Sequence, residues 1–272
     1  MLFRSSNRRE DYWITVSDLM AGLMVIFLFI AIAYMIKVQK QFDAFVYLQK
    51  EYIEAQEAIA KKLETEFERD LRIWDAKIDK ETLAIIFQEP DVMFDKNEAT
   101  IKPRFREILD DFFPRYIEAL TNAKYTIKDS TFSAKDRIAK IRIEGHSSPE
   151  WRINTPERIA FQNNMDLSQR RASSVLRYSL DRVKTKNYAW IKEKILAVGY
   201  SSSEPVFDFT KNDIDKEASR RVEFRVVMDA QQLLYQIISG NPPPGFNSRA
   251  VTEKDRQELL KQLETRKINL RK

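Results

Sequence analysis

Residues 14–36 form an apolar run that contains a single ionisable side chain, Asp18. As a helix that rises 1.5 Å per residue, this run would be about 35 Å long, which is enough to cross a bilayer. It is longer than the core of a signal peptide, and no cleavage site with a polar start follows it, so we expect it to remain attached. The sequence therefore predicts a single-pass membrane protein.

The residues before the run indicate its orientation. Arg4, Arg8 and Arg9 precede it, and Tyr12 and Trp13 are placed where an interfacial aromatic belt would lie. Because Lys and Arg are enriched on the cytoplasmic side of membranes, we expect residues 1–13 to be cytoplasmic. In a bacterial inner membrane, the chain from residue 37 onward would then be periplasmic.

Asp18 is the residue of the run whose presence is energetically unfavourable and therefore indicates a function. A carboxylate near mid-membrane costs about 2.5–3.5 kcal/mol on insertion scales, and the run contains no Lys or Arg to neutralise it. Burial favours the neutral carboxyl group, so Asp18 could take up a proton and release it to a water-filled path formed with a partner membrane protein. The alternative is that Ser17 or Asp18 only caps a shorter spanning helix over residues 19–36.

The composition excludes several classes of function. Cysteine is absent and His146 is the one histidine, which rules out disulfides, cysteine nucleophiles and multi-histidine metal sites. Only five glycines occur, too few and too scattered for a dinucleotide fingerprint or a phosphate-binding loop. The net charge of +5 is spread along the chain, so we expect no direct nucleic-acid partner. We expect a protein that is not an enzyme and that holds no cofactor or metal.

Residues 37–81 contain neither glycine nor proline and predict a long helical spacer. Their apolar residues recur three and four positions apart, at Tyr52, Ala55, Ile59, Leu63, Phe67, Leu71, Trp74 and Ile78. This stripe has two interpretations. It could pair with a second copy as a coiled coil with little supercoil, or it could pack against the downstream domain.

The periodicity changes after the spacer and predicts an α+β domain over residues 82–229. Strands are expected at 82–88, 138–144, 195–200 and 220–228, and helices at 103–120 and 159–183, giving the order βαβαββ with the helices on one sheet face. Residues 230–272 are expected to be a tail with a chain break at 241–245. A charged helix should follow, starting at Thr252 with Asp255 completing a capping box. The tail would stabilise a dimer or be flexible.

Motifs in this domain resemble the OmpA-like peptidoglycan-binding family over about residues 82–229. They are Glu144-Gly145-His146, Asn164 with Leu167-Ser168 and Arg171-Ala172, and Arg220-Arg221-Val222-Glu223. The resemblance implies that Arg171 holds the carboxylate of the diaminopimelate in peptidoglycan stem peptides, with Asn163, Asn164, Leu167 and Ser148 as further contacts. Ser148 stands where the family has an Asp that holds the amine, and Glu150 could take over that part. A guanidinium suits a carboxylate because its planar fork donates two parallel hydrogen bonds.

An early membrane Asp, a helical spacer and this domain together resemble the B subunits of ion-driven stators such as MotB. Residues 13–31, with Ser147-Ser148 and Glu150-Trp151, are most similar to the ZorB family of Zorya anti-phage systems. That resemblance implies a homodimer inside a ring of membrane A subunits (ZorA- or MotA-like), with Asp18 carrying H⁺ or Na⁺. It also implies anchoring to peptidoglycan and coupling to cytoplasmic defence effectors through the A subunits. A flagellar-type stator subunit and a non-conducting wall tether are the alternatives.

Overall fold

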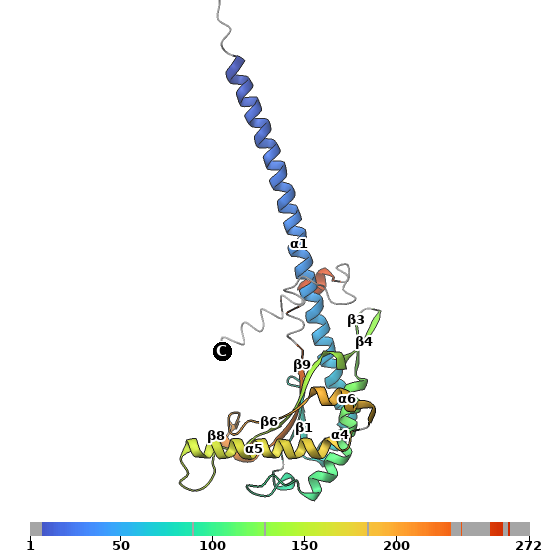
Figure 1. The fold of residues 1–272 in the computed structure, drawn as a ribbon, viewed down its shortest axis with the longest axis vertical. Helices are drawn as coiled ribbons and strands as arrows, with labels where there is room; N and C mark the ends of the chain where they lie inside the picture. Colours follow the sequence, from blue (N-terminus) through green and yellow to red (C-terminus); the bar gives the residue numbers. More distant parts are fainter. Residues whose placement is uncertain are drawn as a thin grey trace, which may run out of the picture. The chain divides into compact units, whose positions relative to one another are not determined.

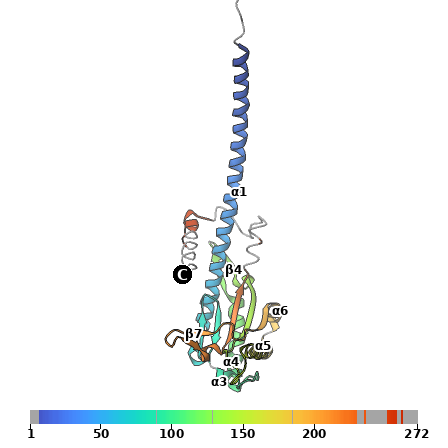
Figure 2. The same cartoon turned by 90° about the vertical axis from the view of Figure 1, so that its left-hand side faces the viewer.

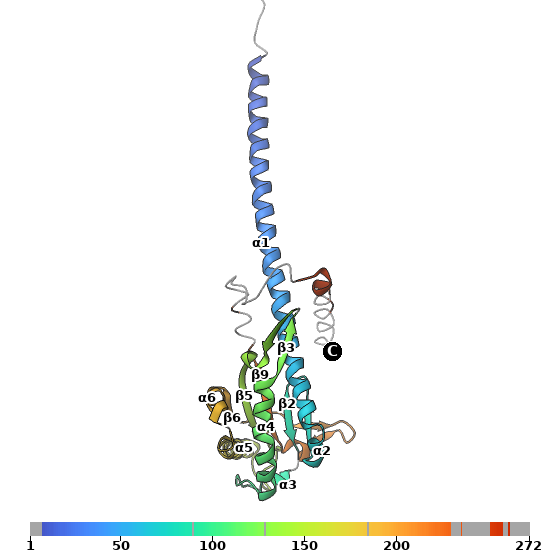
Figure 3. The same ribbon diagram turned by 90° about the vertical axis from the view of Figure 1, so that its right-hand side faces the viewer.

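The structure, a computed structural model, describes residues 7–88, 90–127, 129–183, 185–229, 235, 251–257 and 261. The chain divides into two compact units, Met1–Lys50 with Gln232–Lys272, and Glu51–Gln231. Their elements can be followed by label and colour in Figures 1, 2 and 3. Arg4 and the predicted chain break at 241–245 lie outside the described residues.

The first element is the single helix α1 (Asn7–Phe67), which includes the whole apolar run. This helix is long and apolar enough to cross a membrane, and its most apolar window, with mean hydropathy 2.7, is not buried within the chain. Since α1 begins at Asn7, Asp18 lies about three turns inside it. The alternative that Ser17 or Asp18 caps the helix is therefore wrong.

The predicted capping box in the tail is present. The backbone N–H and Oγ1 of Thr252 lie 2.8 and 2.6 Å from Oδ2 of Asp255, and the Asp255 N–H donates to Thr252 Oγ1 at 3.2 Å. A helix follows over residues 253–257. Within the same unit, Lys50 pairs with Asp255 and Arg256 pairs with Asp43, each at 2.8 Å. The described part of the tail therefore braces the middle of α1.

The second unit is built on a five-stranded sheet in the order β1-β2-β9-β5-β6. Its strands are β1 (Ala76–Asp79), β2 (Ala84–Phe87), β5 (Ile138–Gly145), β6 (Ile195–Gly199) and β9 (Val222–Met228). Only the pairing of β5 with β6 is parallel. The long helices are α4 (Pro103–Asn122), which opens with proline at its first turn, and α5 (Glu157–Leu180). These elements confirm the predicted α+β class. The four predicted strands correspond to β2, β5, β6 and β9, the two predicted helices correspond to α4 and α5, and their order along the chain is the predicted one.

Both long helices cover the same face of the sheet, as predicted. Ile143 on β5 lies directly opposite Phe224 on β9, so their side chains share a face. Phe224 contacts Phe112 of α4 at a ring distance of 4.9 Å. Gly145, two residues after Ile143, lies against the backbone of α5 at Ser168. The opposite face is polar, and it carries Arg142, Glu144, Glu223 and Arg225.

The predicted spacer helix over residues 37–81 needs correction. α1 ends at Phe67, a short helix α2 (Asp70–Ile73) follows, and residues 76–79 form β1. Asp75 takes a left-handed backbone conformation at φ 46°, which turns the chain into the strand. The chain leaves the helix because β1 pairs with β2, which satisfies the backbone groups of an otherwise exposed sheet edge.

The apolar stripe of α1 packs against the domain rather than against solvent. Its members Ala55, Ile59, Leu63 and Phe67 are fully buried. The ring of Phe67 lies 5.2 Å from that of Phe112. Of the two interpretations of the stripe, the second therefore describes residues 51–67, which belong to the domain's core.

Shorter elements that were not predicted complete this unit. They are α3 (Pro90–Met93), the β3–β4 hairpin (Lys124–Ile127, Ser130–Ser133), η1 (Ala134–Arg137), α6 (Thr185–Lys194), the β7–β8 hairpin (Val206–Asp208, Asp213–Asp215) and α7 (Lys216–Ser219). Two of them fasten α1. The buried carboxylate of Glu51 accepts hydrogen bonds from Tyr125 on β3, at 2.7 Å, and from the guanidinium of Arg137 in η1.

Candidate wall-binding pocket

A pocket of about 280 Å³ lies where the loop after β5, the loop after α3 and the first half of α5 meet. Four of the five residues predicted to contact peptidoglycan line it: Ser148, Asn164, Leu167 and Arg171. The rest of the lining is Asp91, Phe94, Lys96, Asn97, Ser147, Glu150, Trp151 and Arg220. Asn163, the fifth predicted residue, is half-buried on α5 and does not line the pocket.

The position of α5 depends on two glycines at the ends of parallel strands. A Cβ atom on Gly145 would lie 2.4 Å from the carbonyl oxygen of Ser168, and one on Gly199 would lie 2.5 Å from the backbone nitrogen of Gln169. No side chain fits at either place, so glycine allows the helix backbone to approach the strand ends. The Ser201 N–H donates to Ser168 Oγ at 3.0 Å and the Gly199 N–H to Gln169 Oε1 at 2.8 Å, which fixes the register of α5.

The spacing of the motif on α5 explains which of its residues reach the pocket. Asn164, Leu167 and Arg171 are three and four positions apart and so share one face of the helix, whereas Asn163 is rotated away from it. The amide nitrogen of Asn164 donates to the carbonyl oxygens of Ser148, at 3.0 Å, and Glu150, at 3.3 Å. Asn164 therefore holds the loop after β5 in place, while Leu167 supplies a buried apolar wall.

Arg171 is a cation without a carboxylate partner among the described residues. Its Nε donates to the carbonyl oxygen of Glu98 at 2.8 Å and one Nη to that of Asp95 at 3.2 Å, and its guanidinium lies 4.9 Å from the ring centroid of Phe94. Burial, together with the positive charges of Arg220 and Arg170, lowers the pKa of Arg171 to about 10. The side chain is still charged at neutral pH, and it is disposed to bind an anion. Among the described residues, Arg171 forms no salt bridge that would account for its charge without a ligand.

The loop that follows β5 brings two serines to the pocket. The Ser147 N–H donates to the carbonyl oxygen of Ser201 at 2.8 Å, and both Ser147 and Ser148 are only 4% exposed. The hydroxyl of Ser147 is buried and has no hydrogen-bond partner among the described residues. A hydroxyl can donate and accept, so this one is available to a ligand group that lies in the pocket.

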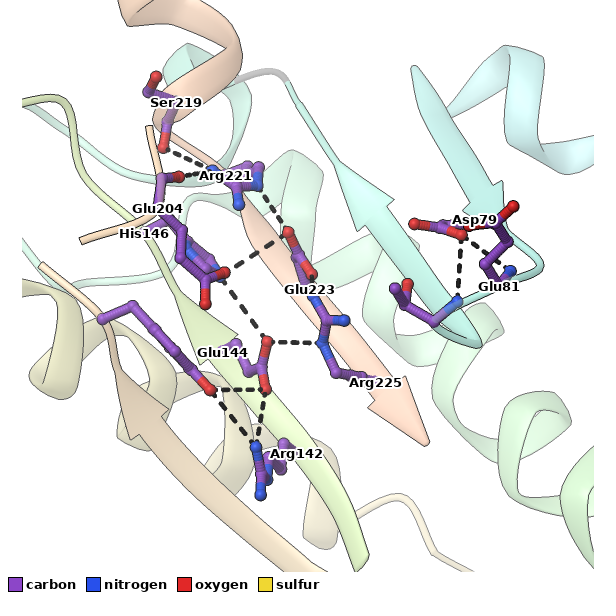
Figure 4. Close-up of polar contacts among 12 residues, drawn as sticks. Asp79, Glu81, Arg142, Glu144, His146, Glu204, Ser219, Arg221, Glu223 and Arg225 are labelled. Atoms are coloured by element: carbon purple, nitrogen blue, oxygen red, sulfur yellow. Dashed lines mark hydrogen bonds and ion pairs between the residues drawn. The ribbon is translucent and has the colours of Figure 1, made fainter. Parts of the chain in front are cut away.

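A buried polar network on the far face of the sheet holds the strands that carry these loops (Figure 4). Arg225 donates to Glu144 at 2.9 Å and to Glu223 at 2.6 Å, and Arg221 donates to Glu223 at 2.6 Å. Burial alone would raise the pKa of Glu144, but His146 and the guanidinium of Arg225 outweigh it, and that pKa lies below its ordinary value. The network joins β5 to β9, because Glu144 on β5 and Glu223 on β9 both accept hydrogen bonds from the guanidinium of Arg225.

His146 belongs to this network and shapes the strand end. Its ring stacks on Tyr200 at 4.9 Å, its backbone N–H donates to the carbonyl oxygen of Arg221, and its Nε2 lies 3.8 and 3.7 Å from Glu144 and Glu223. One oxygen or nitrogen atom from each of these three residues lies within 4.8 Å of the others, the spacing of a metal-ligand set. The carboxylates already accept hydrogen bonds from two guanidinium groups, whose charge opposes a cation. This donor set therefore does not fit a metal ion.

Asp18 is separate from the pocket and belongs to the other unit. Its side chain is exposed on α1, amid exposed apolar neighbours such as Leu19 and Ile14. Among the described residues, it has no hydrogen-bond or ion-pair partner. A carboxylate in such a run needs a polar partner from another chain or a proton.

Several lining residues were not singled out from the sequence as site residues: Asp91, Phe94, Lys96, Asn97, Ser147, Trp151 and Arg220. Arg220 is part of the Arg-Arg-Val-Glu motif, and that motif could have suggested it. The loop of residues 94–101 reaches the pocket because a bridge joins Phe94 to Ile101 and Arg171 binds its carbonyl oxygens. Backbone carbonyls carry no sequence signal, so this contact could not be foreseen.

Comparison with known proteins finds a matching family model and related chains. The model of the OmpA family matches residues 93–221. The chain is 44% identical over 233 residues to the Zorya protein ZorB of Escherichia coli, which covers 84% of this chain and 93% of the relative. It is also 28% identical over 148 residues to YtxE of Bacillus subtilis, covering 54% of this chain and 49% of that protein. Among solved structures, a MotB-like protein from Desulfovibrio vulgaris aligns with a TM-score of 0.46 at 21% identity, covering 67% of this chain and 97% of that one.

Proposed function

The chain belongs to the ZorB family, and from this membership we propose that it is the peptidoglycan-anchored B subunit of an inner-membrane, ion-driven motor used in anti-phage defence. The N-terminus would be cytoplasmic and the OmpA-family domain periplasmic. Two copies would lie within a ring of A subunits, which would pass the motion to cytoplasmic effectors. The role is mechanical and ion-translocating, not enzymatic.

The observation that carries the proposal is the place of Asp18. It lies about three turns inside an exposed apolar helix and has no polar partner among the described residues. Protonation would remove its charge and its need for a partner, so each uptake or release of H⁺, or of Na⁺, can favour one position of a neighbouring helix over another. A second element supports the anchoring role, because Arg171, which has no carboxylate partner among the described residues, offers a cation to a carboxylate of the wall.

The ion-carrying role is tested by phage plating on cells with the native locus and either wild type or Asp18→Asn, at matched membrane abundance. Asn keeps the size and polarity but cannot exchange a proton, so protection should be lost. Ser17→Asn is the control, since it introduces the same amide one position away and should leave protection intact. Full protection by Asp18→Asn would contradict ion carriage and favour the non-conducting tether.

The anchoring role is tested by co-sedimentation of the full chain, in detergent, with purified peptidoglycan sacculi. Arg171→Ala should abolish sedimentation. Arg170→Ala is a matched control on the next position of α5, where the arginine is exposed and pairs with Asp166 at 2.9 Å. Equal sedimentation of both variants would refute the assignment of Arg171. If the locus with the wild-type chain gave no protection in the phage-plating assay, the flagellar-type stator would become the better interpretation.

A further inference from the structure

The charges of the pocket favour a ligand that presents a carboxylate. Its lining contains three cations, Lys96, Arg171 and Arg220, against two carboxylates, Asp91 and Glu150. Arg171 donates hydrogen bonds to two backbone carbonyls, and one of its Nη groups has no partner among the described residues. A ligand carboxylate would compensate this charge through charge-assisted hydrogen bonds.

The two acids of the lining are poorly placed to compensate a second, positive ligand group. The side chain of Glu150 is 43% exposed and lies 3.8 Å from Lys216, and Asp91 is exposed. Exposed carboxylates are screened by water and contribute little to binding a cation. The buried part of the polar lining instead contains Ser147 and Ser148, which are neutral.

The serine hydroxyls of the lining suit an amide better than an ammonium. The buried Ser147 hydroxyl has no hydrogen-bond partner among the described residues, and it can accept from an amide N–H or donate to its carbonyl. An ammonium group in the same place would lose its hydration without gaining a counter-charge, and the guanidinium of Arg171, which has no carboxylate partner among the described residues, would repel it.

These observations distinguish two forms of the wall peptide. The distal end of a diaminopimelate residue carries a carboxylate and an amine; the amine is a free ammonium in uncross-linked stem peptides and is part of an amide in cross-linked ones. Resting on the proposed wall binding, we infer that this pocket selects the cross-linked form, with the carboxylate on Arg171 and the amide on the Ser147 and Ser148 hydroxyls. The motor would then be anchored to mature, load-bearing peptidoglycan.

The test measures the affinity of the full chain in detergent for three synthetic tripeptides that contain diaminopimelate. One has the free distal amine, one has that amine acetylated as a mimic of the cross-link, and one has the distal carboxylate converted to an amide. We expect the acetylated peptide to bind more tightly than the peptide with the free amine. The carboxamide should bind about tenfold or more weakly, the loss expected for a charge-assisted hydrogen bond.

Ser148→Asp adds a carboxylate where an ammonium would lie and should shift the preference about tenfold toward the free amine. Ser203→Asp is the control, since this exposed serine lies outside the pocket lining and adds the same charge. Equal or tighter binding of the free amine by the native chain would overturn the inference and leave wall binding intact. Binding of none of the peptides and no sedimentation with sacculi would instead overturn the proposed anchor. The ranking by the native chain decides the question even if Ser148→Asp does not fold.

Discussion

Phe67→Ala tests whether the last third of α1 is part of the domain core. Phe67 is fully buried, and its ring lies 5.2 Å from Phe112, 5.9 Å from Trp74 and 5.0 Å from the guanidinium of Arg115. Burial of a phenylalanine side chain contributes about 1.5–3 kcal/mol, and the cavity left by its removal raises the cost to about 3–5 kcal/mol. A domain of this size has about 5–15 kcal/mol in total, so the variant should lose a large share of its stability.

The assay is unfolding of the full chain in detergent, by urea and by heat, followed by near-ultraviolet circular dichroism. At about 2–4 °C per kcal/mol for a domain of this size, Phe67→Ala should lower the Tm by roughly 6–20 °C. Phe209→Ala is the matched control, because Phe209 is 87% exposed in the same unit and its loss should change the free energy of unfolding by less than about 0.5 kcal/mol. If Phe67→Ala stayed within about 1 kcal/mol of wild type, the helix end would not be part of the core and the coiled-coil interpretation of the stripe would return.

Three further predictions concern the strand ends, acid stability and pairing. Gly145→Ala should destabilise the domain by about 1–3 kcal/mol in urea unfolding, and weaken binding to sacculi, because its Cβ would lie 2.4 Å from the Ser168 carbonyl oxygen and displace α5. The pKa of Glu144 is lowered in the folded state, so its contribution to stability is complete above the ordinary value of 4.5 and is lost as the pH falls through the folded value. Urea unfolding between pH 3 and 7 should therefore show a weaker acid slope for Glu144→Gln than for wild type. In this cysteine-free chain, the proposed dimer predicts that oxidised Phe42→Cys, at a 36% exposed position, gives a disulfide-linked dimer on non-reducing gels, whereas Ile59→Cys, at a fully buried position, does not.

The elements of the domain that could be predicted from the sequence are those with a strong local pattern of their own. Residues 84–87 are a short apolar, β-branched run bounded by turns, and α4 combines an N-terminal proline with apolar residues three and four apart. The stripe of residues 52–78 shows only that one face is buried, not what covers it. Its helical spacing continues through residues 71, 74 and 78, yet the pairing of β1 with β2, a tertiary contact, overrides that local pattern.

The same distinction applies to the pocket. Arg171, Leu167 and Asn164 could be predicted because a motif on one helix face places them together, and Ser148 because it follows a strand end. Lys96 and Asn97 could not, because their loop is held by hydrogen bonds to its carbonyl oxygens, which any residue supplies. Asn163 does not line the pocket, because a motif match does not resolve which of two adjacent asparagines faces inward.

For the proposed anchor, the packing of the C-terminal end of α1 in the domain core gives a path by which force on the pocket could reach α1. A load on Arg171 passes along α5 to β5 and β6, whose strand ends contact its backbone at Gly145 and Gly199. The carboxylate and guanidinium network ties β5 to β9, and the rings of Phe224, Phe112 and Phe67 join that sheet to α1. Each step is a packed or hydrogen-bonded contact between regular elements, and close-packed interiors transmit strain. A spacer that ended in a flexible linker before the first strand would dissipate the load, so the burial of residues 55–67 is the feature that suits this helix to a mechanical role.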